Sequence, residues 1–401
     1  MKRIYFDHAA STPTRKEVIK AMTPYFSSCF GNPSSLHSFG QEGIKAIDKA
    51  RETVAHALNA QFREIVFTGS ATEANNLALR GSIRQFKLLN PNVRPRILVS
   101  AIEHESVLET AKDLERDGVE RVIIPVNESG LVDVERIKKE LNERTVLISV
   151  MYVNNEIGSV QPLSEIAELI KKWKAVRKEK TPYPIFHTDA VQAFNYFDCN
   201  VEGLGVDMMT ISGHKIGGPK GVGVLYVRDL QPKTNNVQGQ KKMQPITTGG
   251  GQEFGMRSGT ENVPCIVGFA EALRLASRER KKERARLLAI KKYFWSGLKK
   301  IITDVRIYGA DEKHFSDASP HILNVSWSGA HIDDVIVRLD ILGISASSGS
   351  ACASRASTHS HVLSALLENA SRGIRFSFGR TTTKSEIDET LKRMKKAFKA
   401  Y

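Results

Sequence analysis

The chain of 401 residues lacks any long uninterrupted hydrophobic run, although 41% of its residues are hydrophobic. Without about 18 consecutive apolar residues, no segment is expected to span a membrane. The basic N-terminus, Met1 to His8, is not followed by the apolar stretch of a secretory signal, so we expect a cytoplasmic protein. No internal repeat or low-complexity tract is present either, and no long linker separates parts of the chain.

Cysteine is also scarce, with only Cys29, Cys199, Cys265 and Cys352. No two of them form a Cys-x-x-Cys pair, so neither a zinc site nor an iron–sulfur site held by this chain alone is expected. A disulfide framework is not expected at this size and cysteine density. Isolated cysteines are usually small buried side chains. The question is therefore whether one of the four lies in an unusual setting.

Acidic residues are outnumbered: 58 Lys and Arg against 44 Asp and Glu give a net charge of +14. Such a surplus is one feature of nucleic-acid-binding proteins. Much of it falls in helix-like stretches, such as 278–286 and 392–399, without an RNA-binding motif. We interpret it as solvated helix faces and do not expect direct nucleic-acid binding. An acidic protein partner or a weak affinity for tRNA stays open.

Short apolar runs alternate with helical patterns through the first 230 residues, which is typical of buried parallel strands and their connecting helices. Strands are expected at 97–100, 121–124, 146–151, 185–187, 208–211 and 222–227, and helices near 104–117, 133–142 and 163–179. This alternation predicts an α/β fold with a mainly parallel sheet covered on both faces.

The pattern changes after Gly259. We expect a large domain over residues 16–260 and a smaller α+β domain formed by residues 1–15 and 261–401. The later elements are expected as a long helix at 262–303, a strand near 321–326, a helix at 331–342, a Ser- and Gly-rich loop at 345–360 and a closing helix at 384–399.

A candidate cofactor site begins with Lys215, which follows the strand at 208–211 on a glycine-rich turn. Parallel sheets bind ligands at the carboxyl ends of their strands. Glycines there let a flat ring approach the backbone. Partial burial lowers a lysine pKa, which allows a Schiff base to form. Taken alone, however, one lysine in so basic a chain is far more often a surface residue.

Polar residues follow three further strands. Asp189 could keep the pyridine nitrogen of pyridoxal phosphate (PLP) protonated, although an Asp after a strand is more often a helix N-cap. Gln192 and Asn155 could contact the phenolic oxygen of the ring. His104 could stack on the ring and act as an acid or base.

The segment from Thr68 to Asn76 leads into a helix, whose free N–H groups could bind phosphate together with the hydroxyl of Thr72. A capping box that involves Ser70 or Thr72 is the alternative, and both can hold. The combined indication is strong because one sheet edge would collect residues from five segments: Thr72, His104, Asn155, Asp189 and Lys215.

With these motifs in order, the sequence resembles the group I cysteine desulfurases, the NifS/IscS-like branch of the class V aminotransferase family. The resemblance runs from Tyr5 to about residue 390 and is carried by segments 31–35, 71–73, 103–104, 154–156, 189–192, 212–215, 257–260, 347–352 and 374–377. It implies a fold-type I PLP enzyme with a seven-stranded sheet in its large domain. It also implies L-cysteine as substrate and a homodimer.

The resemblance further implies a role for each site residue. Lys215 would carry the cofactor and remove the substrate α-proton, Cys352 would attack the substrate sulfur, and His104 would assist proton transfers. The other implied cofactor contacts come from Ala71, Thr72, Asn155, Asp189, Gln192, Ser212 and His214. Thr260 would reach the phosphate of the neighbouring subunit. Asn32 and Arg375 would hold the substrate carboxylate, which a guanidinium can pair at both oxygens.

The loop at 345–360 is rich in serine and has no large apolar side chain, so we expect it to be mobile and Cys352 to be accessible. A thiol of ordinary pKa, about 8.5, needs a nearby base or positive charge to become a thiolate at neutral pH. Cys352 would then hold a persulfide for a sulfur-acceptor protein, either an iron–sulfur scaffold or a tRNA-thiolation enzyme.

The chain departs from the family pattern in its glycine-rich stretch, where Thr248 and Phe254 stand in place of His and Arg. These changes could alter the subunit interface or the edge of the cofactor site. Two alternatives stay open: a selenocysteine lyase or another fold-type I PLP enzyme such as an aminotransferase, and a non-catalytic module that binds RNA or an assembly scaffold.

Overall fold

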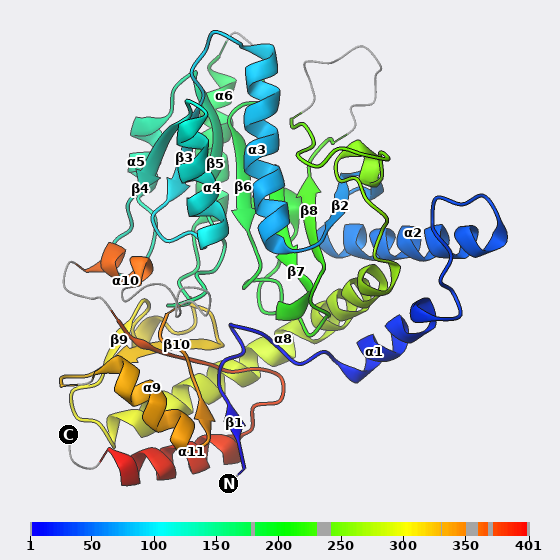
Figure 1. Cartoon of the computed structure of the whole chain (residues 1–401). Coiled ribbons are helices and arrows are strands. Elements are labelled where there is room, and N and C mark those ends of the chain that lie inside the picture. The colour runs from blue at the N-terminus through cyan, green and yellow to red at the C-terminus, as the bar shows by residue number, and fades with distance from the viewer. Residues whose placement is uncertain are drawn as a thin grey trace.

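The computed structural model describes residues 2–177, 181–230, 242–329, 331–349, 360–367 and 372–398 (Figure 1). Its centre is a seven-stranded sheet with the order β2-β8-β7-β6-β5-β3-β4. The strands are β2 (Ile65–Thr68), β3 (Arg96–Ser100), β4 (Glu120–Ile124), β5 (Thr145–Ser149), β6 (Ile185–Asp189), β7 (Met208–Ser212) and β8 (Gly223–Val227). Strands β3 to β7 pair in parallel, and β8 pairs antiparallel with both β7 and β2.

Both faces of this sheet are buried except along the edge strand β4, which is partly exposed. Along β3, Ile97 and Val99 belong to the hydrophobic cluster that includes α3 and α4, while Leu98 belongs to the cluster on the other face. This alternation follows from the two-residue period of a strand. The continuous apolar runs of the sequence arise because helices cover both faces. The covering and connecting helices are α3 (Ala71–Leu89), α4 (Glu105–Arg116), α5 (Val134–Glu140), α6 (Leu163–Ala175) and α7 (Val201–Leu204).

A smaller three-stranded antiparallel sheet has the order β12-β10-β9. Its strands are β9 (Arg306–Tyr308), β10 (Ile322–Ser326) and β12 (Ile374–Ser377). The N-terminal strand β1 (Ile4–Tyr5) pairs in parallel with β11 (Ile344–Ser345) nearby. The helices of this part are α9 (Ile332–Ile341), α10 (His361–Leu366) and α11 (Lys384–Ala397).

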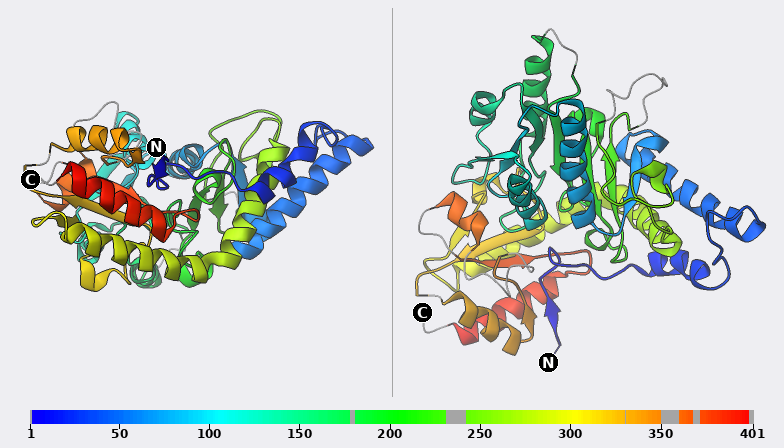
Figure 2. Two further views of the ribbon diagram at one scale, coloured as in Figure 1. Left: turned by 90° about the horizontal axis from the view of Figure 1, so that it is seen from below. Right: turned by 45° about the horizontal axis from the view of Figure 1, so that its top comes forward.

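Helix α8 (Val263–Lys299) links the two sheets: it runs from beside α1 and α2 to the three-stranded sheet, where α11 lies along it (Figures 1 and 2). At the opposite end of α8, α1 (Lys16–Met22), a short 3-10 turn η1 (Thr23–Phe26) and α2 (Ser38–Leu58) project to one side of the molecule. We call residues 16–58 the arm.

The α/β fold and the mainly parallel sheet predicted from the sequence are confirmed, as are the six predicted strands, within a few residues. The long helix predicted at 262–303 corresponds to α8. The sequence did not indicate β9, β12 or the length of α2. Within the described ranges, no helix is long and apolar enough to cross a bilayer.

Candidate active site

A cavity of about 310 Å³ opens at the carboxyl edge of the seven-stranded sheet. The ends of β3, β5, β6 and β7 meet there because parallel strands finish at the same edge. Its lining includes these predicted residues: Ala71, Thr72, His104, Asn155, Asp189, Gln192, Ser212, His214, Lys215 and Arg375. The structure therefore brings together most of the site that the sequence predicts.

Asp189, the last residue of β6, has its carboxylate held by two donors. Oδ1 accepts from the backbone N–H of Val191 at 2.9 Å, and Oδ2 accepts from Nδ2 of Asn75 at 2.9 Å. The same Asn75 amide donates to Ser106 Oγ at 2.8 Å. The carboxylate is thus fixed in orientation while it still lines the cavity.

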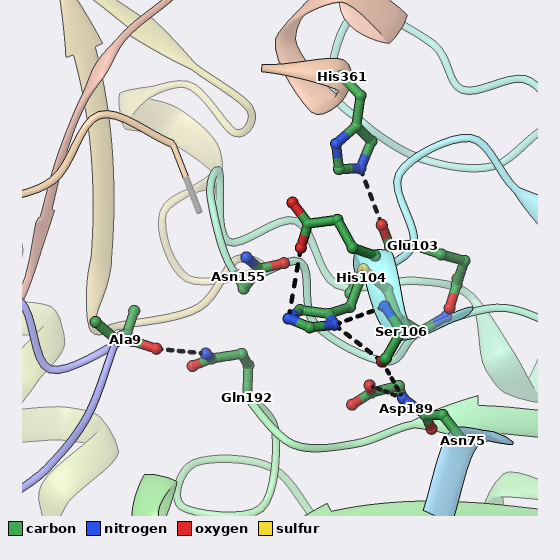
Figure 3. Close-up of polar contacts among 12 residues, drawn as sticks. Ala9, Asn75, Glu103, His104, Ser106, Asn155, Asp189, Gln192 and His361 are labelled. Carbon is green, nitrogen blue, oxygen red and sulfur yellow. Dashed lines mark hydrogen bonds and ion pairs between the residues drawn. The ribbon is translucent and has the colours of Figure 1, made fainter. Parts of the chain in front are cut away.

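His104 continues this network (Figure 3). Its Nδ1 accepts from the backbone N–H of Ser106 at 3.1 Å and lies 2.9 Å from Ser106 Oγ. Because a backbone N–H can only donate, Nδ1 is the acceptor, and the proton of the neutral ring is on Nε2. A chain of hydrogen bonds therefore joins Asp189 to His104 through Asn75 and Ser106, and neither Asn75 nor Ser106 was predicted.

Lys215 lies on the short 3-10 turn η3 (Gly213–Lys215) that follows β7. Its Nζ donates to the backbone oxygens of Ala9 at 2.5 Å and Ala10 at 2.9 Å. A methyl group on Gly213 would lie 2.8 Å from Pro219 O, so this tight turn requires glycine. The amine is thereby directed into the cavity from the strand end and held against the N-terminal segment.

The N-terminus of α3 supplies one end of the cavity through Ala71 and Thr72. The preceding Ser70 caps the helix by accepting from the N–H of Glu73 at 3.1 Å, which confirms a cap at Ser70. The cap is compatible with a phosphate at this helix end, which stays a prediction. On the facing turn, burial, together with the charges of Lys215 and Lys220, lowers the pKa of His214 to about 4. This concentration of N–H groups and positive charge suits a phosphate.

Arg375 lines the cavity from the other side, on β12 of the smaller sheet. Its side chain is 1% exposed. Nη1 donates to Asn155 O at 2.8 Å, and Nη2 pairs with Asp7 Oδ1 at 3.0 Å. Asp7 was not predicted. It orients the guanidinium and compensates its charge, which is costly to bury alone.

Two predicted residues do not line the cavity in this chain. Asn32 is exposed on the arm, where its side chain accepts from the N–H of Ser34 at 3.0 Å. Thr260 is exposed after the glycine-rich segment, residues 248–255. Both assignments stay predictions.

Cys352 lies outside the described residues, but described residues on both sides of it lie close to the carboxylate of Glu156. Ser360 Oγ donates to Glu156 Oε2 at 2.6 Å, and a methyl group on Gly349 would lie 3.3 Å from the same oxygen. Ser347 and Arg375 exchange backbone hydrogen bonds of 3.2 and 2.7 Å. Next to Ser360, His361 Nε2 donates to Glu103 O at 2.9 Å (Figure 3). Both ends of the loop are thus tied beside the cavity.

The other three cysteines do not line the cavity. Cys199 is fully buried, and burial raises the pKa of its thiol to about 12. Burial also raises the pKa of Cys265. Among the described residues, no group of three or more His, Cys, Asp or Glu side chains could hold a metal ion.

Phe254, which stands in place of the family arginine, does not line the cavity. Its ring lies 6.2 Å from that of Phe62, and the guanidinium of Arg51 lies 4.8 Å from its centroid. Arg51 also makes two 2.8 Å hydrogen bonds to the carboxylate of the adjacent Glu253. Phe254 therefore packs against the base of α2. Thr248 is exposed.

Known proteins resemble this chain over nearly its whole length. A family model described as aminotransferase class-V matches residues 4–390. The chain is 41% identical over 395 residues to the cysteine desulfurase IscS of Dictyoglomus turgidum, covering 98% of this chain and 93% of that protein. A solved NifS-like protein is 32% identical with a TM-score of 0.85, covering 98% and 99% of the two chains. The structure described as SspA in complex with cysteine is 35% identical with a TM-score of 0.77, covering 93% and 98%.

Proposed function

Since the chain belongs to the aminotransferase class-V family, we propose that it is a PLP-dependent cysteine desulfurase. It converts L-cysteine to L-alanine and keeps the sulfur as a persulfide on Cys352. The observation that carries this proposal is the cavity in which Asp189, Lys215 and the N-terminus of α3 face Arg375.

The cavity fits a flat phosphorylated pyridine. Asp189 would hold the proton of the ring nitrogen, and Gln192 and Asn155 would approach the ring oxygen. Ala71, Thr72, Ser212 and His214 would surround the phosphate at the helix N-terminus. When bound, the cofactor accepts the electron pair that remains after the substrate α-proton leaves.

The protein residues bind the substrate and move protons. Arg375, oriented by Asp7, pairs with the substrate carboxylate, and Lys215 Nζ removes the α-proton. The Cys352 thiolate then attacks the substrate sulfur. A sulfur–sulfur bond forms as the carbon–sulfur bond breaks, and its electron pair goes to the β-carbon, which gains one proton. The α-carbon then regains the proton that Lys215 removed, which gives alanine. His104 assists through Nε2, because its Nδ1 is already occupied as an acceptor.

Delivery of Cys352 is supported by the described ends of its loop. Ser360 and Gly349 meet at Glu156, whose neighbour Asn155 lines the cavity. The exchange of backbone hydrogen bonds between Ser347 and Arg375 brings one end beside the carboxylate-binding guanidinium. The remaining cysteines lack this position.

The proposal includes a homodimer with shared sites. Phe26, Phe30 and Leu36 on the arm are 66%, 68% and 93% exposed, which is unusual for large apolar side chains. Asn32 lies among them. A second copy that covers this surface would allow Asn32 to join Arg375 and would allow Thr260 to reach a phosphate in the neighbouring cavity.

We also propose the domain division 16–260 against 1–15 with 261–401. The pairing of β1 with β11 and of Asp7 with Arg375 supports the assignment of the N-terminal segment to the smaller domain. A cytoplasmic location and a sulfur acceptor, either an iron–sulfur scaffold or a tRNA-thiolation enzyme, complete the proposal.

The test is incubation of the PLP-loaded protein with L-cysteine and a thiol reductant, followed by assay of alanine and sulfide. Equal amounts of the two products are expected, and Cys352→Ala should retain the cofactor but release neither at the native rate. Cysteine and selenocysteine rates, compared side by side, separate a desulfurase from a selenocysteine lyase. A yellow protein that yields neither product would contradict the proposal.

A further inference from the structure

Both the nitrogen and the oxygen of the Gln192 side-chain amide make hydrogen bonds to residues far away in the sequence. Nε2 donates to Ala9 O at 3.0 Å (Figure 3), and Oε1 lies 3.2 Å from Nε2 of His321. The side chain is 7% exposed and lines the cavity. Because Nε2 carries two hydrogens and only one is needed for Ala9, this cavity-lining amide has a second N–H to donate.

His321 stands directly before β10 and is 3% exposed. Its Nδ1 lies 2.6 Å from Ser319 Oγ, and its ring lies on that of Tyr196, with centroids 4.5 Å apart at 33°. Burial, reinforced by the charges of Lys291, Arg375 and Lys215, holds the pKa of His321 well below its usual range. The imidazole is therefore neutral and has a single N–H.

The position of that N–H follows from the neighbours. The Oε1 of Gln192 can only accept, so His321 Nε2 is the donor in this contact, and its Nδ1 accepts from the hydroxyl of Ser319. Ser319 is itself anchored, because its N–H donates to Gly158 O at 2.8 Å and its carbonyl accepts from Lys291 Nζ at 3.0 Å. A buried series of hydrogen bonds thus ends at the cavity.

We propose that His321 is a positioning residue that fixes the amide of Gln192, so that Gln192 presents an N–H and not its carbonyl oxygen to the ring oxygen of the cofactor. Without His321, the hydrogen bond from Nε2 to Ala9 O is the one contact above that still opposes rotation of the amide. A reversed amide would place an acceptor against an oxygen that carries negative charge.

This inference rests on the proposed function, and its consequence can be seen without turnover. A donor to the ring oxygen stabilises negative charge there. When no donor is present, the negative charge on the ring oxygen instead holds the proton on the nitrogen atom that joins the cofactor to the lysine. Loss of the donor therefore raises the pH at which the visible absorbance of the bound cofactor changes. One hydrogen bond to a charged group corresponds to a shift of about one pH unit.

The experiment is a pH titration of that absorbance in the PLP-loaded parent and in His321→Leu, His321→Gln and Gln192→Leu. His321→Leu is expected to raise the midpoint by about one unit. His321→Gln keeps a donor at a similar reach and is expected to restore the parent value. Ser319→Ala, a milder change, should shift the midpoint in the same direction by less, and serves if His321→Leu fails to fold.

A double variant decides whether His321 acts through Gln192. In the Gln192→Leu background, His321→Leu is expected to add no shift. An equal shift in both backgrounds, or no shift in the single variant, would overturn the inference while leaving the proposed function intact. A parent protein that shows no visible band after addition of PLP would overturn the proposed function and this inference with it.

Discussion

On the cavity wall, polar side chains are buried and bonded to one another, whereas on the arm large apolar side chains are exposed. Ser106, Asp189 and Gln192 are 9%, 5% and 7% exposed, while Phe30 is 68% and Leu36 is 93% exposed. The chain thus holds these wall side chains with its own hydrogen bonds and leaves the arm uncovered. The difference underlies our proposal that one copy builds most of the cofactor site and that a second copy completes it.

The largest expected effect comes from the wall. Asp189→Asn keeps the shape of the side chain but removes its charge, so the ring nitrogen would lose the group that holds its proton. We expect kcat to fall by about 10³-fold, as for other charge-stabilising groups. Initial rates of alanine formation at saturating PLP provide the measurement. The exposed Asp198→Asn is the matched control, and a similar loss in both variants would contradict the assignment.

The junction of the arm with the sheet is the next target. Arg51 on α2 and Glu253 form a buried pair whose side chains are 5% and 2% exposed, and Glu253 also accepts from the N–H of Phe67 at 2.8 Å. Glu253→Gln would leave the Arg51 charge uncompensated and should cost about 3 kcal/mol of unfolding free energy.

Urea unfolding at pH 7 measures this cost. Glu271→Gln breaks the comparable but exposed pair with Arg274 and should change stability by less than about 1 kcal/mol. Equal losses in the two variants would show that the arm is not anchored through the buried pair.

A pH effect separates the buried sheet from the surface. His187, between Ser149 Oγ at 2.9 Å and Thr210 Oγ1 at 3.1 Å, is fully buried, and burial lowers its pKa to about 3. The unfolded chain binds a proton there near pH 6.5 while the folded protein does not, so stability falls as the pH drops below 6.5. Between pH 7 and pH 5 this group should cost about 2 kcal/mol.

The variant His187→Gln lacks this titrating group, so its loss of stability between pH 7 and pH 5 should be about 2 kcal/mol smaller than in the parent. His56→Gln on the surface should leave the profile as in the parent. Unfolding free energies at pH 5, 6 and 7 provide the test. A profile that is equally steep in His187→Gln would mean that other groups cause the acid sensitivity.

The smallest expected effect concerns the arm itself. Leu36→Ser should weaken self-association by about tenfold, or about 1.4 kcal/mol, because the side chain would lose an apolar contact with the second copy. Sedimentation over a dilution series measures this. Leu88→Ser, on α3 and 69% exposed, is the matched control. Unchanged association in Leu36→Ser would place the interface elsewhere.

The strand-end residues could be predicted from the sequence because chain order and a parallel sheet together determine which residues share an edge. Thr72, Asp189 and Lys215 needed only local patterns. Their partners could not be found in this way: Asp7 meets Arg375 across 368 positions, and Gln192 meets His321 across 129. No periodicity encodes such long-range contacts, which depend on how the two sheets pack.

The surroundings of Phe254 could not be predicted from the sequence either. The sequence marks it as a departure from the family but does not reveal that Arg51, 203 positions earlier, lies against its ring. Asn32 and Thr260 show the opposite limit, because a resemblance assigns them to the site while one chain alone leaves them exposed.

The central claim is that Cys352 receives the sulfur, and peptide mass spectrometry tests it most directly. The PLP-loaded protein would be treated with one equivalent of L-cysteine without reductant and then digested under conditions that preserve persulfides. We expect one additional sulfur atom on the peptide that contains Cys352, with alanine in equal amount, and none on the peptides of Cys29, Cys199 or Cys265. Alanine formed with the extra sulfur on another cysteine, or on none, would contradict it.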